Sequence, residues 1–306
     1  MAWVEPRVGG YSGSHLPSFG HGTLEWVPLP AEFVPTSYGL AAVFAWGTSD
    51  FLGGYASRRA NAFLLTSLAH ASGLVFMLLL AFRTAPFPSP PSRLWAVVGG
   101  ISGGGALAIF YRALAVGRMG LVAPVAAVLG AAIPAIFLVF TQGPPGFVHL
   151  AGFVVAIVGI WLISRSEDGR GPEGIGLAVL AGVGFAGFFL GISQAKDGSA
   201  QWLAAFSRAG SLMVTGSVVM FERKFRDMTS ASARWGLLAG CLDTSGTALF
   251  LCAARSGRLD SAVVLTSLYP AVTVLLARLV LHEHFTRKKA LGMLAAMLSV
   301  PMIAKR

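Results

Sequence analysis

Six ionisable side chains lie inside strongly apolar stretches of this 306-residue chain: Asp50, His70, Arg112, Arg208, Asp243 and Arg278. An ionisable residue at the centre of a membrane span costs about 2.5–3.5 kcal/mol on insertion scales, so each is a functional candidate by default. A carboxylate in such a place can hold a proton or a cation. A guanidinium can hold an anion or pair with a carboxylate.

Asp50 follows Trp46 by four residues, so the two side chains share one face of a helix. A carboxylate beside an aromatic ring in an apolar cavity can bind a cationic substrate or carry a coupling proton. The alternative is a residue at the helix end or cavity mouth, since Gly53 and Gly54 follow closely.

Asp243 opens the segment Asp243-Thr-Ser-Gly-Thr247 and has Gly103 as its counterpart in the internal repeat described below. Asymmetry between two halves is expected of a substrate site and not of a scaffold. The alternative is a structural partner for Arg208.

Arg208 begins a polar stripe that continues with Ser211 and Thr215, at helical spacings of three and four residues. One polar face on an apolar helix is expected to point into the bundle. We expect Arg208 to pair with Asp243 or Asp50, or to contact an anionic group on a substrate.

The other ionisable residues have simpler interpretations. Arg112 and Arg278 lie near the ends of their segments and are expected to reach the membrane interface. His70 is interpreted as a hydrogen-bonded interior histidine in preference to a proton relay.

Prolines interrupt two of the apolar segments. Pro270 should kink its helix and release a carbonyl near Thr266. With Thr266, Tyr269 and Thr273 nearby, this segment could offer hydrogen bonds to a ligand. A kink for packing alone is the alternative. Pro124 and Pro134 are expected to kink the equivalent segment of the other half, and both segments are expected to line a central cavity.

The composition excludes a soluble protein. Hydrophobic residues make up 55% of the chain and charged residues only 12%, against about 25% charged residues in soluble domains. The net charge of +10 comes from Lys and Arg lying between apolar runs, which is typical of loops that flank membrane spans. These residues form no basic face of the kind that binds nucleic acid.

Ten apolar segments approach the roughly 20 residues that span a bilayer, and they are too continuously apolar for barrel strands, so we predict helices. Residues 1–35 are interpreted as a poorly ordered tail and not as a signal peptide. The predicted spans are 36–56, 62–82, 93–115, 119–140, 147–165, 174–195, 202–221, 235–254, 261–281 and 288–304.

One stretch occurs twice at a constant spacing that maps Gly117 onto Gly257 and Gly152 onto Gly292. The repeat indicates duplication of a half-protein, with halves at residues 36–165 and 174–305. Five spans in each half would invert the second half relative to the first. Inverted repeats are typical of secondary transporters, whose site lies between the halves near the membrane midplane.

The repeated junctions resemble those of EamA-type transporters of the drug/metabolite transporter (DMT) superfamily. The similar stretches are Phe110-Tyr-Arg-Ala-Leu-Ala-Val-Gly-Arg-Met-Gly-Leu-Val-Ala-Pro124, Leu265-Thr-Ser-Leu-Tyr-Pro-Ala-Val-Thr-Val-Leu-Leu-Ala-Arg-Leu-Val-Leu-His-Glu283, Thr286-Arg-Lys-Lys-Ala-Leu-Gly292 and Ala45-Trp-Gly-Thr-Ser49. Two departures are Thr141-Gln-Gly143, where the family usually has an acidic residue, and His282-Glu-His284 in place of Gly-Glu-Arg/Lys.

This resemblance implies an all-α membrane protein of ten helices in two inverted five-helix repeats. It implies export or exchange of small metabolites, amino acids or drugs, with no ATP, no prosthetic group and both termini in the cytoplasm. The loops after the odd-numbered spans carry more Lys and Arg than the others, which favours the opposite orientation by the positive-inside rule. We favour the orientation that the resemblance implies.

We therefore expect a secondary active transporter of the cell membrane, and not an enzyme, that works by alternating access. Spans one, three, four, six, eight and nine would line its cavity. Asp50 and Asp243 would carry the coupling proton or meet the substrate charge, and Trp46, Tyr269 and Phe185 would form apolar walls. No metal or cofactor is expected, and the partners are a small molecule and the lipid bilayer, with no oligomer indicated. The alternatives are an uncoupled facilitator or exchanger and, from another class, a membrane-embedded enzyme acting on lipid.

Overall fold

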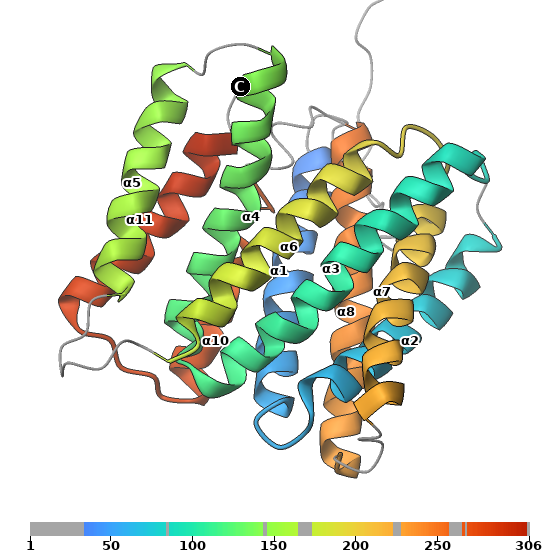
Figure 1. Cartoon of the computed structure of the whole chain (residues 1–306), viewed down its shortest axis with the longest axis horizontal. Coiled ribbons are helices and arrows are strands. Elements are labelled where there is room, and N and C mark those ends of the chain that lie inside the picture. Colours follow the sequence, from blue (N-terminus) through green and yellow to red (C-terminus); the bar gives the residue numbers. More distant parts are fainter. Residues whose placement is uncertain are drawn as a thin grey trace, which may run out of the picture.

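The computed structural model describes residues 34–83, 86–142, 146–164, 173–222, 228–256, 265–266 and 268–304. The predicted N-terminal tail and most of the second Gly-Arg junction lie outside these ranges. The described part is all-helical (Figure 1), as predicted. Its helices are α1 (Val34–Ala56), α2 (Ala62–Ala81), α3 (Pro90–Val116), α4 (Met119–Gln142), α5 (Phe147–Ser164), α6 (Ile175–Ser193), α7 (Ala200–Glu222), α8 (Ser230–Ser256), α10 (Tyr269–Val280) and α11 (Arg287–Ala304).

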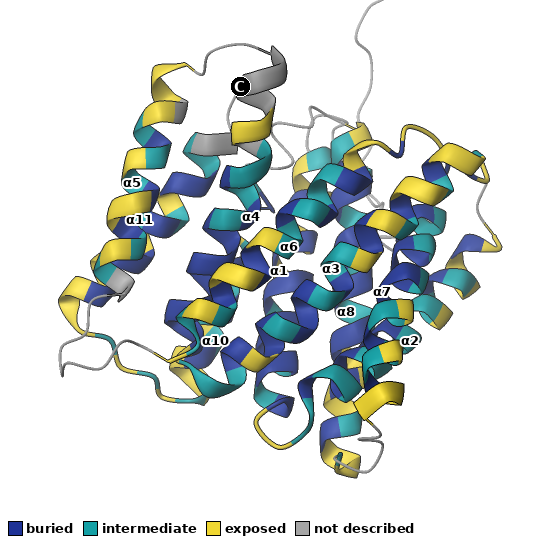
Figure 2. Ribbon diagram, viewed as in Figure 1, coloured by how far each residue is buried: buried dark blue, intermediate teal, exposed yellow. Residues whose placement is uncertain are grey.

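Several helices have the length and composition of membrane spans. Among the described helices, α2, α3, α6, α7 and α8 are long and apolar enough to cross a bilayer. Their outward faces carry exposed apolar side chains such as Leu79, Val183 and Met220, and buried residues face the middle of the bundle (Figure 2). Apolar surface on this scale requires lipid around the bundle, because water would not solvate it.

The helices pack mainly across the two halves of the chain. In the described part, α1 packs against α8 and α3 packs against α6. Helix α2 contacts α7 and α8, and α7 in turn contacts α3. Helix α4 packs on α6, α10 and α11, while α5 and α11 form a pair at one edge of the bundle (Figure 1).

Two glycines at equivalent places in the repeat allow these close approaches. A Cβ at Gly100 of α3 would overlap the Ser207 backbone of α7, and a Cβ at Gly240 of α8 would overlap the Ala69 carbonyl of α2. The Ser211 hydroxyl donates a hydrogen bond of 2.8 Å to the Gly100 carbonyl. Small residues let helix backbones approach and make interhelical hydrogen bonds inside a membrane.

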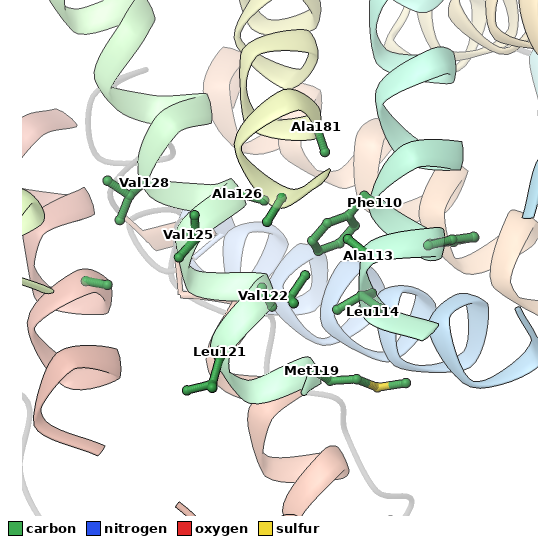
Figure 3. Close-up of a cluster of buried hydrophobic side chains, with 14 of the residues drawn as sticks. Phe110, Ala113, Leu114, Met119, Leu121, Val122, Val125, Ala126, Val128 and Ala181 are labelled. Atoms are coloured by element: carbon green, nitrogen blue, oxygen red, sulfur yellow. The ribbon is translucent and has the colours of Figure 1, made fainter. Parts of the chain in front are cut away.

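A buried apolar cluster joins the end of α3 to the start of α4 and to α6. Figure 3 shows Phe110 and Leu114 of α3 beside Val122 and Ala126 of α4, with Ala181 of α6 above them. All five side chains are almost wholly buried. This packing fixes the short connection between α3 and α4, which is the first copy of the repeated junction.

Helix α1 is held against α3 and α8 directly beside the candidate carboxylate. The Ser49 hydroxyl donates to the Ala239 carbonyl at 2.8 Å and lies 3.1 Å from the Tyr111 hydroxyl. Gly53 brings α1 close to the Tyr111 ring, because any side chain there would overlap it. These contacts set the rotation of α1 and therefore the direction of Asp50.

Candidate functional site

A cavity of about 60 Å³ lies where α1, α3, α6, α7, α8 and α10 meet. At roughly 10–15 Å³ for each water-sized probe, this is room for a few water molecules. Every predicted substrate or coupling residue lines it except Thr266. Its lining residues are Trp46, Asp50, Gly103, Leu107, Phe185, Phe188, Phe189, Arg208, Ser211, Asp243, Thr247 and Tyr269.

The helices that line the cavity differ from the predicted set by one exchange: α7 takes the place of α4. None of the described side chains of α4 lines the cavity, whereas Arg208 and Ser211 of α7 do. Pro124 is buried and Pro134 is partly buried on α4, which packs behind α6 and against α10 and α11. For the described side chains, the expectation that span four lines the cavity is therefore wrong.

The predicted proline kink in span nine is also corrected. Pro270 lies in the first turn of α10, which begins at Tyr269, and not inside one continuous helix. A proline at this position loses no intrahelical hydrogen bond, because the first amides of a helix have no partner within it. Thr266 is buried outside the cavity lining, while Tyr269 reaches the cavity from the first turn of α10.

Arg208 is held on several sides at the centre of the bundle. Its Nη1 donates to Oδ2 of Asp243, forming a buried ion pair, and its Nη2 donates to the Thr247 hydroxyl at 3.1 Å. Nη1 also lies 3.4 Å from Nδ1 of His70 on α2. Of the two predicted carboxylate partners, Arg208 therefore pairs with Asp243.

Asp50 differs from Asp243 in having no such partner. It is 5% exposed and lines the cavity, and among the described residues its carboxylate makes no hydrogen bond or ion pair. When all three groups are ionised, two carboxylates face one guanidinium, so the cavity carries one excess negative charge. Asp50 is thus a buried acid free to take a proton or a cation.

Trp46 forms part of the apolar wall in a fixed orientation. Its indole Nε1 donates to the Asp243 backbone carbonyl at 3.1 Å. Its ring lies edge-on to Tyr269, with centroids 5.9 Å apart, and is tilted against Phe250 at 5.6 Å. A buried indole needs a hydrogen-bond acceptor, and α8 supplies it.

Four cavity residues were not predicted: Leu107, Phe188, Phe189 and Thr247. Thr247 follows Asp243 by four residues, so helical spacing already places both on one face. Phe188 and Phe189 extend the aromatic run that begins at Phe185 on α6, but helical spacing does not say which of them faces the cavity.

The remaining ionisable candidates lie apart from the cavity or beside it. Arg112 and Arg278 are exposed, as expected of side chains that reach the membrane interface. His70 is buried next to Arg208 and does not line the cavity, and its Nε2 has no described hydrogen-bond partner.

The segment His282-Glu-His284 holds one end of the bundle together. Glu283 accepts hydrogen bonds from the amides of Met119 (3.1 Å) and Gly120 (3.2 Å), at the start of α4. Arg58 lies 3.6 Å from the same carboxylate. An anion at the start of a helix accepts hydrogen bonds from the unpaired amides there and is favoured by the helix dipole.

No group of three or more His, Cys, Asp or Glu residues that could hold a metal occurs among the described residues.

Long apolar helices, lipid-compatible outer faces and a buried ionisable cluster define a multi-pass membrane protein. A model of the EamA-like transporter family matches residues 36–165 and 172–305. The chain therefore belongs to this family, within the DMT superfamily, and is a transmembrane transporter. The predicted family is confirmed.

Comparison with solved structures supports the fold. The structure matches 14 chains of solved structures. One of them, described only as "Crystal structure of protein", has a TM-score of 0.63 and 18% sequence identity, covering 88% of this chain and 97% of its own. At this identity the likeness shows the fold alone. No curated protein sequence matches the chain.

Proposed function

We propose that the protein is a secondary active transporter that moves a small molecule across the cell membrane by alternating access, with the cavity as its substrate site. The observation that carries this proposal is Asp50, a buried carboxylate that has no partner among the described residues and faces a cavity between helices of both repeats. A buried acid that is left unpaired destabilises a fold. Its presence is therefore explained best by a ligand or proton that it binds during the transport cycle.

The proposed architecture is ten spans in two inverted repeats, one from residue 36 to 165 and the other from 174 to 305. Its support is the pairing of contacts: α1 with α8 mirrors α6 with α3, and α2 with α8 mirrors α7 with α3. Gly100 and Gly240 make equivalent close contacts in the two halves. Two halves packed in this way can rock about the cavity and open it to either side in turn.

The proposed roles of the two carboxylates differ. Asp243 neutralises Arg208 and holds it between α7 and α8, while Asp50 exchanges a proton for the substrate. Trp46, Tyr269 and Phe185 form the apolar walls. Proton-coupled efflux follows if Asp50 must lose its proton before the substrate binds.

The proposed setting is the cell membrane, with both termini in the cytoplasm. The proposed partners are a small-molecule substrate and the surrounding lipid. Transport of this kind uses a proton gradient and needs no prosthetic group.

Proteoliposomes test this proposal. Labelled amines, amino acids and neutral metabolites would be offered singly under an imposed pH gradient to wild type, Asp50→Asn, Asp243→Asn and Glu173→Gln, whose exposed carboxylate lies outside the cavity. Wild type and Glu173→Gln should drive saturable uptake of at least one compound, and Asp50→Asn should lose the dependence on the gradient. Undiminished gradient-driven flux in Asp50→Asn would refute the proton step at this residue, and undiminished flux in Asp243→Asn as well would exclude both carboxylates. Flux no faster than in protein-free liposomes for every compound would refute transport.

A further inference from the structure

The positive charge in the cavity is already neutralised. Arg208 is the only Lys or Arg among the described residues that line the cavity. Its guanidinium is bound by Asp243 and Thr247 and lies beside His70. The Arg208 Nε has no hydrogen-bond partner among the described residues but is itself fully buried. A carboxylate or phosphate on a substrate would therefore have to displace Asp243 to reach the guanidinium. An anionic group entering this cavity would otherwise be desolvated without a partner, which is costly.

The negative charge in the cavity is available. The Asp50 carboxylate has no partner among the described residues and faces the same space. It lies in α1, whose rotation is fixed by the Ser49 contacts with α3 and α8. A cation in the cavity would therefore meet a positioned acceptor that does not have to break another bond first.

Aromatic rings make up most of the remaining wall. Trp46 of α1, Tyr269 of α10 and the residues Phe185, Phe188 and Phe189 of α6 all line the cavity. The face of an aromatic ring attracts a cation, and more strongly where water is excluded. The same rings pack well against an apolar body.

Taking these three observations together, we infer that the substrate is a compact organic monocation with an aromatic or branched apolar body and no carboxylate, and that the site discriminates against amino acids. This inference rests on the proposed function, since it assigns the substrate class of the same cavity. The ammonium group binds Asp50 and the apolar body lies among the rings. The cavity of about 60 Å³ has room for only a few water molecules in this state, so even a compound with a single ring requires the halves to move apart. A small compound requires the least movement.

Three ligands that share one skeleton separate the possibilities: phenethylamine, phenylalanine and 2-phenylethanol. They differ in carrying an ammonium group alone, an ammonium with a carboxylate, or neither charge. Binding to purified wild-type protein would be measured by calorimetry and by ligand-induced thermal stabilisation. Phenethylamine should bind about tenfold more tightly than either of the other two. Phenylalanine would bury its carboxylate without a partner, and 2-phenylethanol has no positive charge to pair with Asp50.

Variants then test whether Asp50 causes the preference. Asp50→Asn should reduce phenethylamine affinity at least tenfold, to the level of 2-phenylethanol. Asp50→Glu and Glu173→Gln should keep the preference for the amine. Thermal unfolding of each variant without ligand shows whether it is folded.

Three results would overturn the inference: no binding of phenethylamine to wild type, equal or tighter binding of phenylalanine, or undiminished binding of phenethylamine to folded Asp50→Asn. Failure here is distinguishable from failure of the proposed function. Gradient-driven flux of amino acids without amines overturns the substrate class alone. Tight amine binding without any flux overturns transport and leaves the cation site.

Discussion

Asp50 and Asp243 line one cavity, and the same substitution should destabilise the protein at Asp243 but not at Asp50. Asp243→Asn removes the charge that neutralises Arg208, which is only 5% exposed. Breaking a buried ion pair from one side costs about 3–5 kcal/mol, because the remaining charge is buried without compensation. Asp50→Asn removes a carboxylate that has no partner among the described residues, so stability should be unchanged or higher.

Thermal unfolding of the purified proteins in detergent measures both effects. On the scale of soluble domains of 150–250 residues, 1 kcal/mol corresponds to roughly 2–4 °C, so Asp243→Asn should lower the midpoint by roughly 6–20 °C. The Glu173→Gln control should unfold with wild type, because its carboxylate is exposed and outside the cavity. Adding Arg208→Gln to Asp243→Asn should restore part of the loss, since no unpaired charge is then left.

This prediction has two ways to fail. If Asp50→Asn lowers the midpoint as far as Asp243→Asn does, Asp50 has a structural partner and is not the free acid of the cavity. If the double variant is destabilised by the full sum of the single changes, Arg208 and Asp243 are not energetically coupled.

Three further predictions concern contacts outside the cavity. Gly240→Ala should destabilise the protein by about 1–3 kcal/mol in denaturant unfolding, because its Cβ would overlap the Ala69 carbonyl; Gly105→Ala, with nothing within 4 Å of the new Cβ, should not destabilise it. Glu283→Ala should cost about 1 kcal/mol by the same measurement, since the first amides of α4 lose their acceptor; an unchanged unfolding curve would contradict this cap. The Ser89 amide donates a hydrogen bond to Asp197 and holds the pKa of this exposed carboxyl below its ordinary value of 3.8. Because this pKa is lower in the folded state than in the unfolded state, the carboxylate stabilises the fold above pH 3.8. That stabilisation is lost as the pH falls through the folded-state pKa. Asp197→Asn should therefore destabilise slightly at pH 7 and not at pH 2, and an equal effect at both would contradict the interpretation.

Much of the site follows from spacing along single helices. Trp46 and Asp50 share a face because they are four residues apart, and Arg208 heads a polar stripe that had to face inward. Asp243 differs from its counterpart in the first half of the repeat, which is Gly103, and this asymmetry indicated a site residue. These inferences need only helix geometry and the cost of burying charge, and the structure brings all four side chains and Gly103 to one cavity.

What spacing does not give is the neighbour across the cavity. The side chain of Arg208 could have reached either carboxylate, and the choice of Asp243 depends on how α7 and α8 pack. Symmetry between the repeats suggested that α4 and α10 play equal parts, yet only α10 contributes to the described lining through Tyr269. A repeat preserves the path of the backbone, while the substrate site depends on where the halves differ.

The central claim is that Asp50 exchanges a proton for an organic cation. Its most direct test is proton movement in proteoliposomes with an acidic lumen and an enclosed pH indicator. The probe is phenyltrimethylammonium, whose fixed charge brings no proton of its own. Its addition outside should make the lumen more alkaline with wild type and Glu173→Gln, and should have no effect with Asp50→Asn. An equal pH change with Asp50→Asn, or uptake of the cation by wild type without any pH change, would contradict the claim.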